Sequence, residues 1–253
     1  MIIRDTEPYF VMTTQDDHAH FSGEIARGFR DEWFLDENYK DDCLLAIREH
    51  DRSWIRLDAT PVWNDTATFP FSFIDHPVLP KLVMYELGVD ETEEMSAYAA
   101  LLCSMHYASF FKSIPQDAKY EAELAFYHRE LARQARLKEK LNHPDEVMIK
   151  RHFQLLQLCD DISLYVCMNQ KGVSKEQEHP WFKQGFNSLI EDHKFNAEWS
   201  SEHEVQLTPS ILFAQEWTAT LRYKNVPKKR AHEIGINKAY QECDWTELKV
   251  TFV

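Results

Sequence analysis

The stretch AIREHDRSW, residues 46–54, decides how we interpret this chain, because it carries a histidine beside an aspartate within an apolar pattern. The spacing predicts one helix over residues 41–54. On a helical wheel of about 100° per residue, His50 and Asp51 fall inside the apolar stripe. The stripe contains Cys43, Leu44, Ile47, His50, Asp51 and Trp54. A helix that buries this stripe therefore buries a carboxylate and an imidazole with it.

A buried carboxylate without a partner costs several kcal/mol or gives up its charge. A divalent cation bound by both His50 and Asp51 would compensate that charge, because neighbouring helical positions can reach one ion. An ion pair or hydrogen bond to another side chain is the alternative. An isolated His-Asp pair favours the alternative, so the rest of the chain has to decide between them.

Three more polar side chains interrupt the apolar faces of other predicted helices. His18 opens the inward face of a helix that follows the capping box at residues 14–17. His106 lies near the middle of a helical stripe over 93–111, and Asp160 lies at the centre of the stripe of a helix over 145–167. For His106, a hydrogen bond to a backbone carbonyl is the simpler explanation.

Small features add detail to these helices. Gly23 would cost about 1 kcal/mol relative to alanine unless another backbone or a ligand approaches it closely. A helix over 81–87 is expected to end at Gly88. Asp161, on the flank of its helix, and His76, in the long irregular segment 57–80, are weaker site candidates, and the sequence does not decide whether either joins the site.

Composition narrows the class of protein. The 253 residues, 44% of them hydrophobic, are enough for a single domain with a substantial core. We expect a cytoplasmic protein, because no apolar run could span a membrane and the first residues lack the order of a signal peptide. Five cysteines without a paired spacing suit reduced thiols. The net charge of −14 disfavours nucleic acid as a partner and favours a small-molecule substrate, whereas the oligomeric state is not indicated.

The predicted fold class is mainly α with a small antiparallel sheet. The helical core covers residues 14–168. The β-rich parts are residues 1–13 and 203–253, which we expect to form one appended sheet from the N-terminal strand and the C-terminal region. The intervening segment 171–202 is polar and has no clear period, so no strand is expected there.

The order of His18, the pair His50-Asp51, His106 and Asp160 resembles that of the HD superfamily of metal-dependent phosphohydrolases. A more specific resemblance, to an uncharacterised bacterial family of unknown function, covers nearly the whole chain. It is carried by TQxDHAxxSG (residues 14–23), EHDxxW (49–54), DxxP (58–61), YAALLxSxH (98–106) and LLQxxDxxSL (155–164). Ser53 stands where that family usually has glycine and Cys159 where it often has an aromatic residue, and neither is a proposed ligand.

The resemblance implies an HD-like helical core and one or two divalent ions of manganese, iron, zinc, nickel or cobalt. His18, His50, Asp51 and Asp160 would bind one ion. His106 would bind a second ion or donate a proton, so that Asp51 and His106 are the catalytic candidates. The expected activity is hydrolysis of a small phosphorylated substrate. A diiron oxygenase on the same core and a non-catalytic protein that binds a metal or small ligand remain alternatives.

Overall fold

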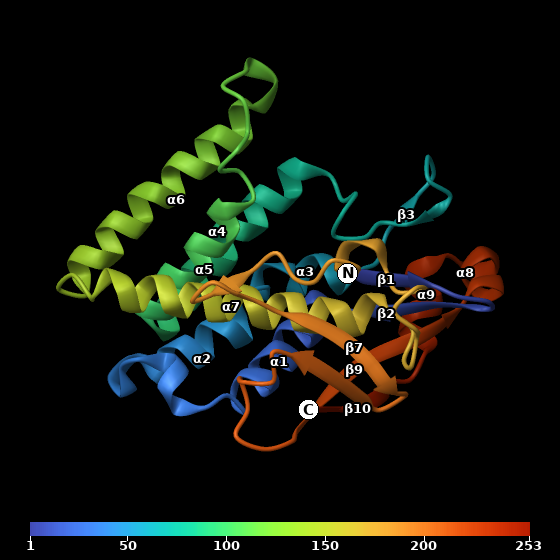
Figure 1. The fold of residues 1–253 in the computed structure, drawn as a ribbon. Coiled ribbons are helices and arrows are strands. Elements are labelled where there is room, and N and C mark those ends of the chain that lie inside the picture. The colour runs from blue at the N-terminus through green and yellow to red at the C-terminus, as the bar shows by residue number, and fades with distance from the viewer.

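The computed structural model describes residues 1–253 and shows a body of helices packed against one curved sheet (Figure 1). The longer helices gather on one side of the molecule, whereas both chain termini lie in the sheet region. The helices are α1 (Gln15–Ala26), α2 (Lys40–Glu49), α3 (Ile55–Asp58), α4 (Val78–Met95), α5 (Ala97–Ser109), α6 (Glu121–Lys140), α7 (Glu146–Met168), α8 (Lys228–Ile234) and α9 (Ile236–Glu242).

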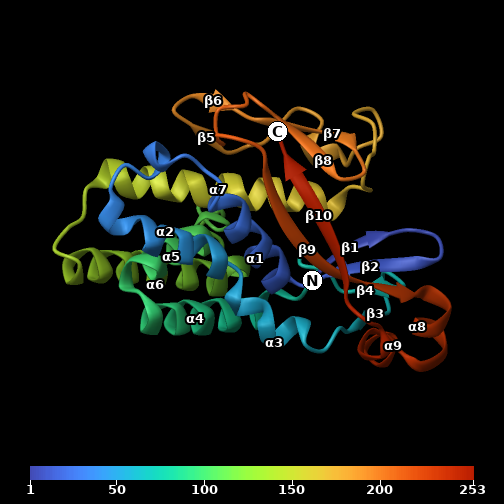
Figure 2. The ribbon, with the colours of Figure 1, turned by 90° about the horizontal axis from the view of Figure 1, so that it is seen from below.

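The main sheet has six strands in the order β1-β2-β9-β10-β8-β7 (Figure 2). Its strands are β1 (Ile2–Asp5), β2 (Tyr9–Thr13), β7 (Asn196–Ser201), β8 (Glu204–Thr208), β9 (Trp217–Pro227) and β10 (Thr246–Phe252). Two short hairpins, β3 (Trp63–Asn64) with β4 (Phe69–Pro70) and β5 (Leu189–Ile190) with β6 (His193–Lys194), lie outside it. The sheet is mixed, because β10 runs antiparallel to β9 and parallel to β8.

The prediction of a mainly α fold with a small antiparallel sheet is wrong. The chain is 51% helix and 19% strand, which makes it an α/β fold. Two strands account for the difference. The 11 residues of β9 pair with both β2 and β10, and β7 lies in the segment 171–202 where no strand was expected. In β7 only Ala197 and Trp199 are buried, so its alternation is too short to be recognised among polar residues.

The helix predicted over 41–54 breaks at the His-Asp pair. Helix α2 ends at Glu49, His50 is its C-cap, and Asp51 has φ −112° and ψ 20°, in the sparsely populated bridge region. A 3-10 turn over Arg52–Trp54 follows and leads into α3. The backbone therefore changes direction directly after His50. Both side chains of the pair face the same interior space, with Nε2 of His50 3.8 Å from Oδ2 of Asp51.

Close backbone packing explains two glycines. A Cβ atom on Gly23 would lie 2.9 Å from Cβ of Arg48, so this glycine allows α1 and α2 to approach, as its position in a helix predicted. Gly88 does not end a helix as predicted but lies inside α4. A Cβ there would lie 2.7 Å from both Cα and the backbone nitrogen of Ser53. Gly88 therefore lets α4 pack against the turn that directly follows Asp51.

One continuous core joins the helical body to the sheet. A cluster of 48 buried hydrophobic residues contains side chains from α1, α2, α4, α5 and α7 together with side chains of β7 to β10. A separate cluster of 8 buried residues lies between the opposite face of β2 and β9 and helices α8 and α9. None of the helices combines the length and apolar character needed to cross a membrane. All five cysteines are free.

Candidate metal centre

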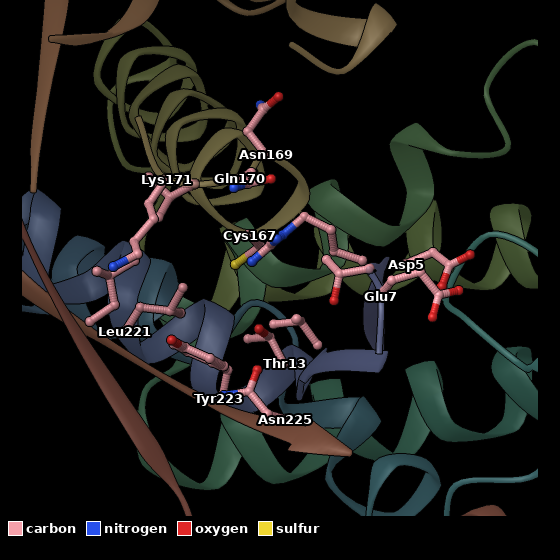
Figure 3. Close-up of a pocket in the computed structure, with 15 residues that line it drawn as sticks. Asp5, Glu7, Thr13, Cys167, Asn169, Gln170, Lys171, Leu221, Tyr223 and Asn225 are labelled. Carbon is pink, nitrogen blue, oxygen red and sulfur yellow. The ribbon is translucent and has the colours of Figure 1, made fainter. Parts of the chain in front are cut away.

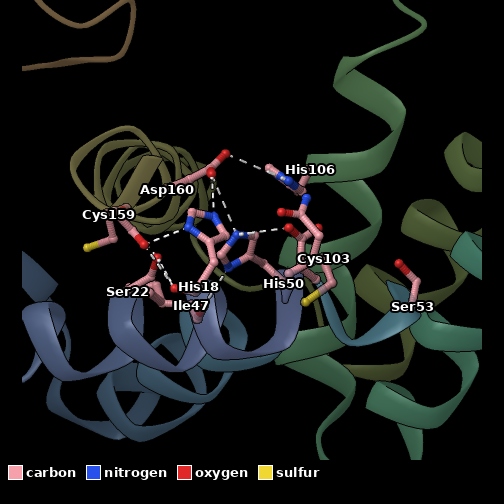
Figure 4. A network of polar contacts seen from close by, with 12 residues as sticks. His18, Ser22, Ile47, His50, Ser53, Cys103, His106, Cys159 and Asp160 are labelled. Carbon is pink, nitrogen blue, oxygen red and sulfur yellow. Dashed lines mark hydrogen bonds and ion pairs between the residues drawn. The ribbon is translucent and has the colours of Figure 1, made fainter. Parts of the chain in front are cut away.

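Three histidines from three different elements lie in a row inside the helical body (Figure 4). The rings of His18 and His50 have centroids 5.2 Å apart at 78°, and those of His50 and His106 are 5.1 Å apart at 81°. His18 comes from α1, His50 from the end of α2 and His106 from α5. The His18 and His50 side chains are inaccessible to solvent, and that of His106 nearly so. The central ring, that of His50, therefore contacts both others.

The two nitrogens of His50 have different environments. Nδ1 lies 2.7 Å from the carbonyl oxygen of Ile47 and donates to it, which leaves the lone pair of the neutral ring on Nε2. Nε2 is buried without a hydrogen-bond partner. It lies 3.8 Å from Oδ2 of Asp51 and 3.7 Å from Oδ1 of Asp160. These separations are too long for hydrogen bonds but fit atoms that share one ion at about 2.0–2.2 Å each.

His18 is held by two serines. The hydroxyl of Ser163 lies 2.6 Å from Nδ1 of His18 and donates to the His18 carbonyl oxygen at 3.0 Å. Since a hydroxyl has one proton, we infer that Nδ1 of His18 donates to Ser163. Nε2 then presents its lone pair toward Oδ1 of Asp160, 3.0 Å away. Ser22 also donates to the His18 carbonyl, at 3.1 Å, but does not contact the ring.

Asp160 lies at the centre of the cluster and offers its two oxygens to different neighbours. Oδ1 faces His18 and His50, whereas Oδ2 lies 3.9 Å from Nε2 of His106 (Figure 4). The other ring nitrogen of His106, Nδ1, is buried and has no partner. Asp160 is also the most exposed member, with 19% of its side-chain surface accessible. A carboxylate in this position can bridge two ions.

The charges of the cluster are not balanced by a lysine or arginine. Burial raises the pKa of Asp51 to about 7. Burial opposes the charge on His50, but the carboxylates of Asp51 and Asp160 raise its pKa to about 9. Burial opposes ionisation of Asp160, but the neighbouring imidazoles of His18, His50 and His106 outweigh burial and hold the pKa of this carboxyl well below its usual range. Without an ion, a protonated His50 is the compensating cation.

The two outer histidines stay neutral. Burial lowers the pKa of His18 and lowers that of His106 to about 3, so each ring keeps a free lone pair at neutral pH. Two groups of potential ligands result, one of His18, His50 and Asp51 and one of His50, His106 and Asp160. In each group the ligand atoms lie within 4.8 Å of one another. This set of nitrogen and carboxylate oxygen donors, with an unpartnered buried nitrogen at its centre, fits a divalent transition metal.

A cavity of about 370 Å³ opens onto this cluster and is lined in part by His106 and Asp160. Its other lining residues are Ser109, Phe110, Gln154, Gln157, Asp161, Asn187, Ser188 and Leu189. No lysine or arginine lines the cavity. Any anion bound there would therefore depend on the cluster for its compensating charge.

The structure brings together all five residues singled out in the sequence, His18, His50, Asp51, His106 and Asp160. Neither of the two weaker candidates belongs to a group of potential ligands. Asp161 accepts hydrogen bonds from the backbone and hydroxyl of Ser188 and lines the cavity. His76 packs against Trp54, with ring centroids 5.8 Å apart.

The sequence pattern around Asp160 contains Gln157 and Ser163, but sequence reasoning assigned no role to either, and it missed the other walls of the cavity. Gln157 precedes Asp160 by three residues, and Gln154 precedes Gln157 by three, so helical spacing could have identified each pair as neighbours on α7. Ser163 follows at the same interval. Asn187 and Ser188 come from an irregular segment near β5, for which the sequence offers no local signal.

Comparison with known proteins assigns the chain to a family but does not indicate an activity. No curated protein and no solved structure matches the chain significantly. Nothing in these comparisons links the chain to the HD superfamily. One family matches residues 1–228, most of the chain. The chain therefore belongs to the family described as "Protein of unknown function (DUF3891)".

Proposed function

We propose that the protein is a metal-dependent hydrolase that acts on a small phosphorylated substrate. The observation that carries this proposal is the buried Nε2 of His50, which has no hydrogen-bond partner and faces two carboxylates at 3.7 and 3.8 Å. A buried polar atom left in this way costs about 1–3 kcal/mol, and an ion between the three groups would remove that cost. The same arrangement makes the HD superfamily the best available analogy for the chemistry.

The proposed ligands divide into two sets that share Asp160. His18, His50, Asp51 and Asp160 would hold a first ion, of manganese, iron, zinc, nickel or cobalt. His106 and the second oxygen of Asp160 would hold another. Such an ion lowers the pKa of a water that it binds and polarises a phosphoryl oxygen.

The protein side chains have separate tasks in this proposal. Asp51 is buried next to His50 and would accept the proton that the attacking water gives up. Ser163 orients the ring of His18 through the contact at Nδ1, so that Nε2 faces the cluster. His106 lies where the cavity meets the cluster, in reach of a substrate bound among the amide and hydroxyl groups of the walls.

The surroundings of the cavity restrict the substrate. Since no lysine or arginine lines the cavity, the phosphate would have to bind at the ions, with the remainder of the molecule against the uncharged walls. The net charge of −14 repels long polyanions outside this region. We therefore expect a small molecule with one phosphate group, whose other part forms hydrogen bonds with amide side chains.

The first test measures metal content. The wild type, Asp51→Asn and Asp161→Asn are purified without oxygen and analysed for metals by mass spectrometry. Asp161→Asn is the matched control, because it makes the same change beside the cluster at a carboxylate that bonds to Ser188. We expect the wild type and Asp161→Asn to retain metal and Asp51→Asn to lose it. Equal metal content in all three would reject Asp51 as a ligand.

The second test measures the reaction. Protein loaded with manganese, zinc or nickel is screened without oxygen against phosphomonoesters, phosphodiesters and nucleotides. We expect phosphate release that disappears in Asp51→Asn and falls in His106→Ala. A two-iron centre that consumes oxygen and releases no phosphate would identify an oxygenase. Such a centre is the main alternative because the two oxygens of Asp160 face different histidines. Metal binding without either activity would identify a binding protein, and both outcomes would overturn the hydrolase.

A further inference from the structure

A second cavity, of about 440 Å³, lies on the sheet and shares no lining residue with the candidate metal centre (Figure 3). Strand pairing explains its floor. Arg4 of β1 is opposite Val11 of β2, which is opposite Asn225 of β9, and Leu221 of β9 is opposite Leu248 of β10. Residues directly opposite each other on neighbouring strands share a face of the sheet. The cavity is therefore built on one sheet face, below the C-terminal end of α7.

Arg4 is a cation without a partner in this cavity. It forms no ion pair with any carboxylate, and its Nε is buried without a hydrogen-bond partner. Partial burial lowers its pKa, which reflects the cost of holding the charge away from water. A guanidinium has five N–H donors, so leaving it in a polar cavity without an acceptor is unusual.

The other charged groups of the cavity already have partners. Lys171 pairs with Glu202 at 2.6 Å. Asp5 and Glu7 both pair with Lys228, at 2.6 and 3.0 Å. Arg4 is thus the one charged group there that is free to bind a ligand.

The remaining lining selects the kind of anion. Thr13, Tyr223 and Asn225 offer hydroxyl and amide groups toward the same space (Figure 3), and the floor contains the apolar side chains of Val11, Leu221 and Leu248. One guanidinium matches one carboxylate with two parallel hydrogen bonds. A phosphate dianion would meet only this cation, and the carbonyl end of α7 nearby disfavours a second negative charge.

We propose that this cavity is a second binding site, for a small organic carboxylate whose apolar part rests on the sheet. Arg4 binds the carboxylate, and Tyr223 and Asn225 form hydrogen bonds at its edge. The site also borders Cys167, which follows Ser163 by one turn of α7. Since Ser163 holds His18, a ligand here lies one turn of α7 from the side chain that orients a proposed metal ligand.

The test measures binding of benzoate, butyrate and inorganic phosphate at constant ionic strength, by calorimetry and by the shift in melting temperature. We expect the wild type to bind both carboxylates, and to bind phosphate at least about tenfold more weakly. Arg4→Gln should lower benzoate affinity by about tenfold or more, because the charge-assisted pair is lost. Arg129→Gln, which makes the same change on the exposed side of α6, should bind benzoate like the wild type.

Two further variants control for loss of the fold and for binding of benzoate at the metal cluster. Asn225→Asp supplies a carboxylate on the same row of the sheet as Arg4, so it should retain the fold and lose benzoate binding. Asp51→Asn should bind benzoate normally. Loss of binding in Asp51→Asn but not in Arg4→Gln would show that benzoate binds at the metal cluster, and would overturn the proposal. Failure of the wild type to bind either carboxylate, or equal binding by Arg4→Gln, would overturn it too.

Discussion

Replacing Ser163 by alanine should weaken metal binding without touching a proposed ligand. Ser163 contacts His18 twice, at the ring nitrogen Nδ1 at 2.6 Å and at the carbonyl oxygen at 3.0 Å. On His18, Ser22 contacts only the carbonyl oxygen, at 3.1 Å. Its hydroxyl also lies 3.2 Å from the carbonyl oxygen of Cys159, and it is as buried as Ser163. The two serines therefore form a matched pair, because Ser163→Ala removes the orientation of the ring and Ser22→Ala does not.

The expected loss of metal affinity follows from the contact that only Ser163 makes, the one with Nδ1 of His18. Loss of a hydrogen bond to a metal-binding histidine typically lowers metal affinity by about 10- to 100-fold. At 1.36 kcal/mol per factor of ten, Ser163→Ala should lose about 1.4–2.7 kcal/mol of binding free energy. Each alanine variant should also lose about 1 kcal/mol of folding free energy, since each removes a buried hydrogen bond to the same carbonyl. The effect on affinity should therefore separate the variants, whereas the effect on stability should not.

The assay is competition between each protein and a fluorescent zinc or manganese chelator, with urea unfolding of the metal-free proteins alongside. Equal affinities of Ser163→Ala and wild type would refute the idea that this hydroxyl orients His18. Equal losses of affinity in Ser163→Ala and Ser22→Ala would also refute it, because the effect would then come from the shared contact with the backbone.

Three further predictions concern charge and packing. Gly88→Ala should lower the free energy of unfolding by roughly 1–3 kcal/mol in urea titrations, because the new Cβ would lie 2.7 Å from the backbone of Ser53. Metal binding at pH 7.5 should release about one proton, since the pKa of His50 is raised to about 9 without an ion and metal requires the neutral ring; calorimetry in buffers of different ionisation enthalpy measures this. Hydrogen bonds from Arg136 lower the pKa of Glu93 to about 2, so Glu93→Gln should lose about 1 kcal/mol of stability at pH 7, and acid titration of unfolding should show that difference vanish between about pH 4.5 and 2.

Helical periodicity could identify the candidate site because its members are polar residues on apolar faces. His18, His106 and Asp160 each interrupt a stripe that has to be buried, and burial forces such groups to find partners. Periodicity says which face a residue occupies but not which residue of another helix it meets. The convergence of these side chains within 4.8 Å in each group depends on how α1, α2, α5 and α7 pack, which one sequence does not specify.

The sheet was underestimated for a different reason. Strand β7 has only two buried residues among six, and part of the stabilisation of such a strand comes from its neighbour β8 rather than from its own residues. Strand β10 runs parallel to β8 although the sequence pattern suggested antiparallel pairing throughout. Pairing direction is set by connections over long distances along the chain, so local alternation could predict strands such as β2 but not their order.

The break at His50 is a feature of the candidate site that helical periodicity did not predict. A continuous helix would have kept the ideal 100° step between His50 and Asp51. The chain instead leaves the helix after Glu49, and Gly88 makes room for the turn that follows. Such an interruption gives up helical hydrogen bonds, so it persists only where the surroundings determine it. Here they direct Nε2 of His50 between two carboxylates, the arrangement on which the proposed ion site depends.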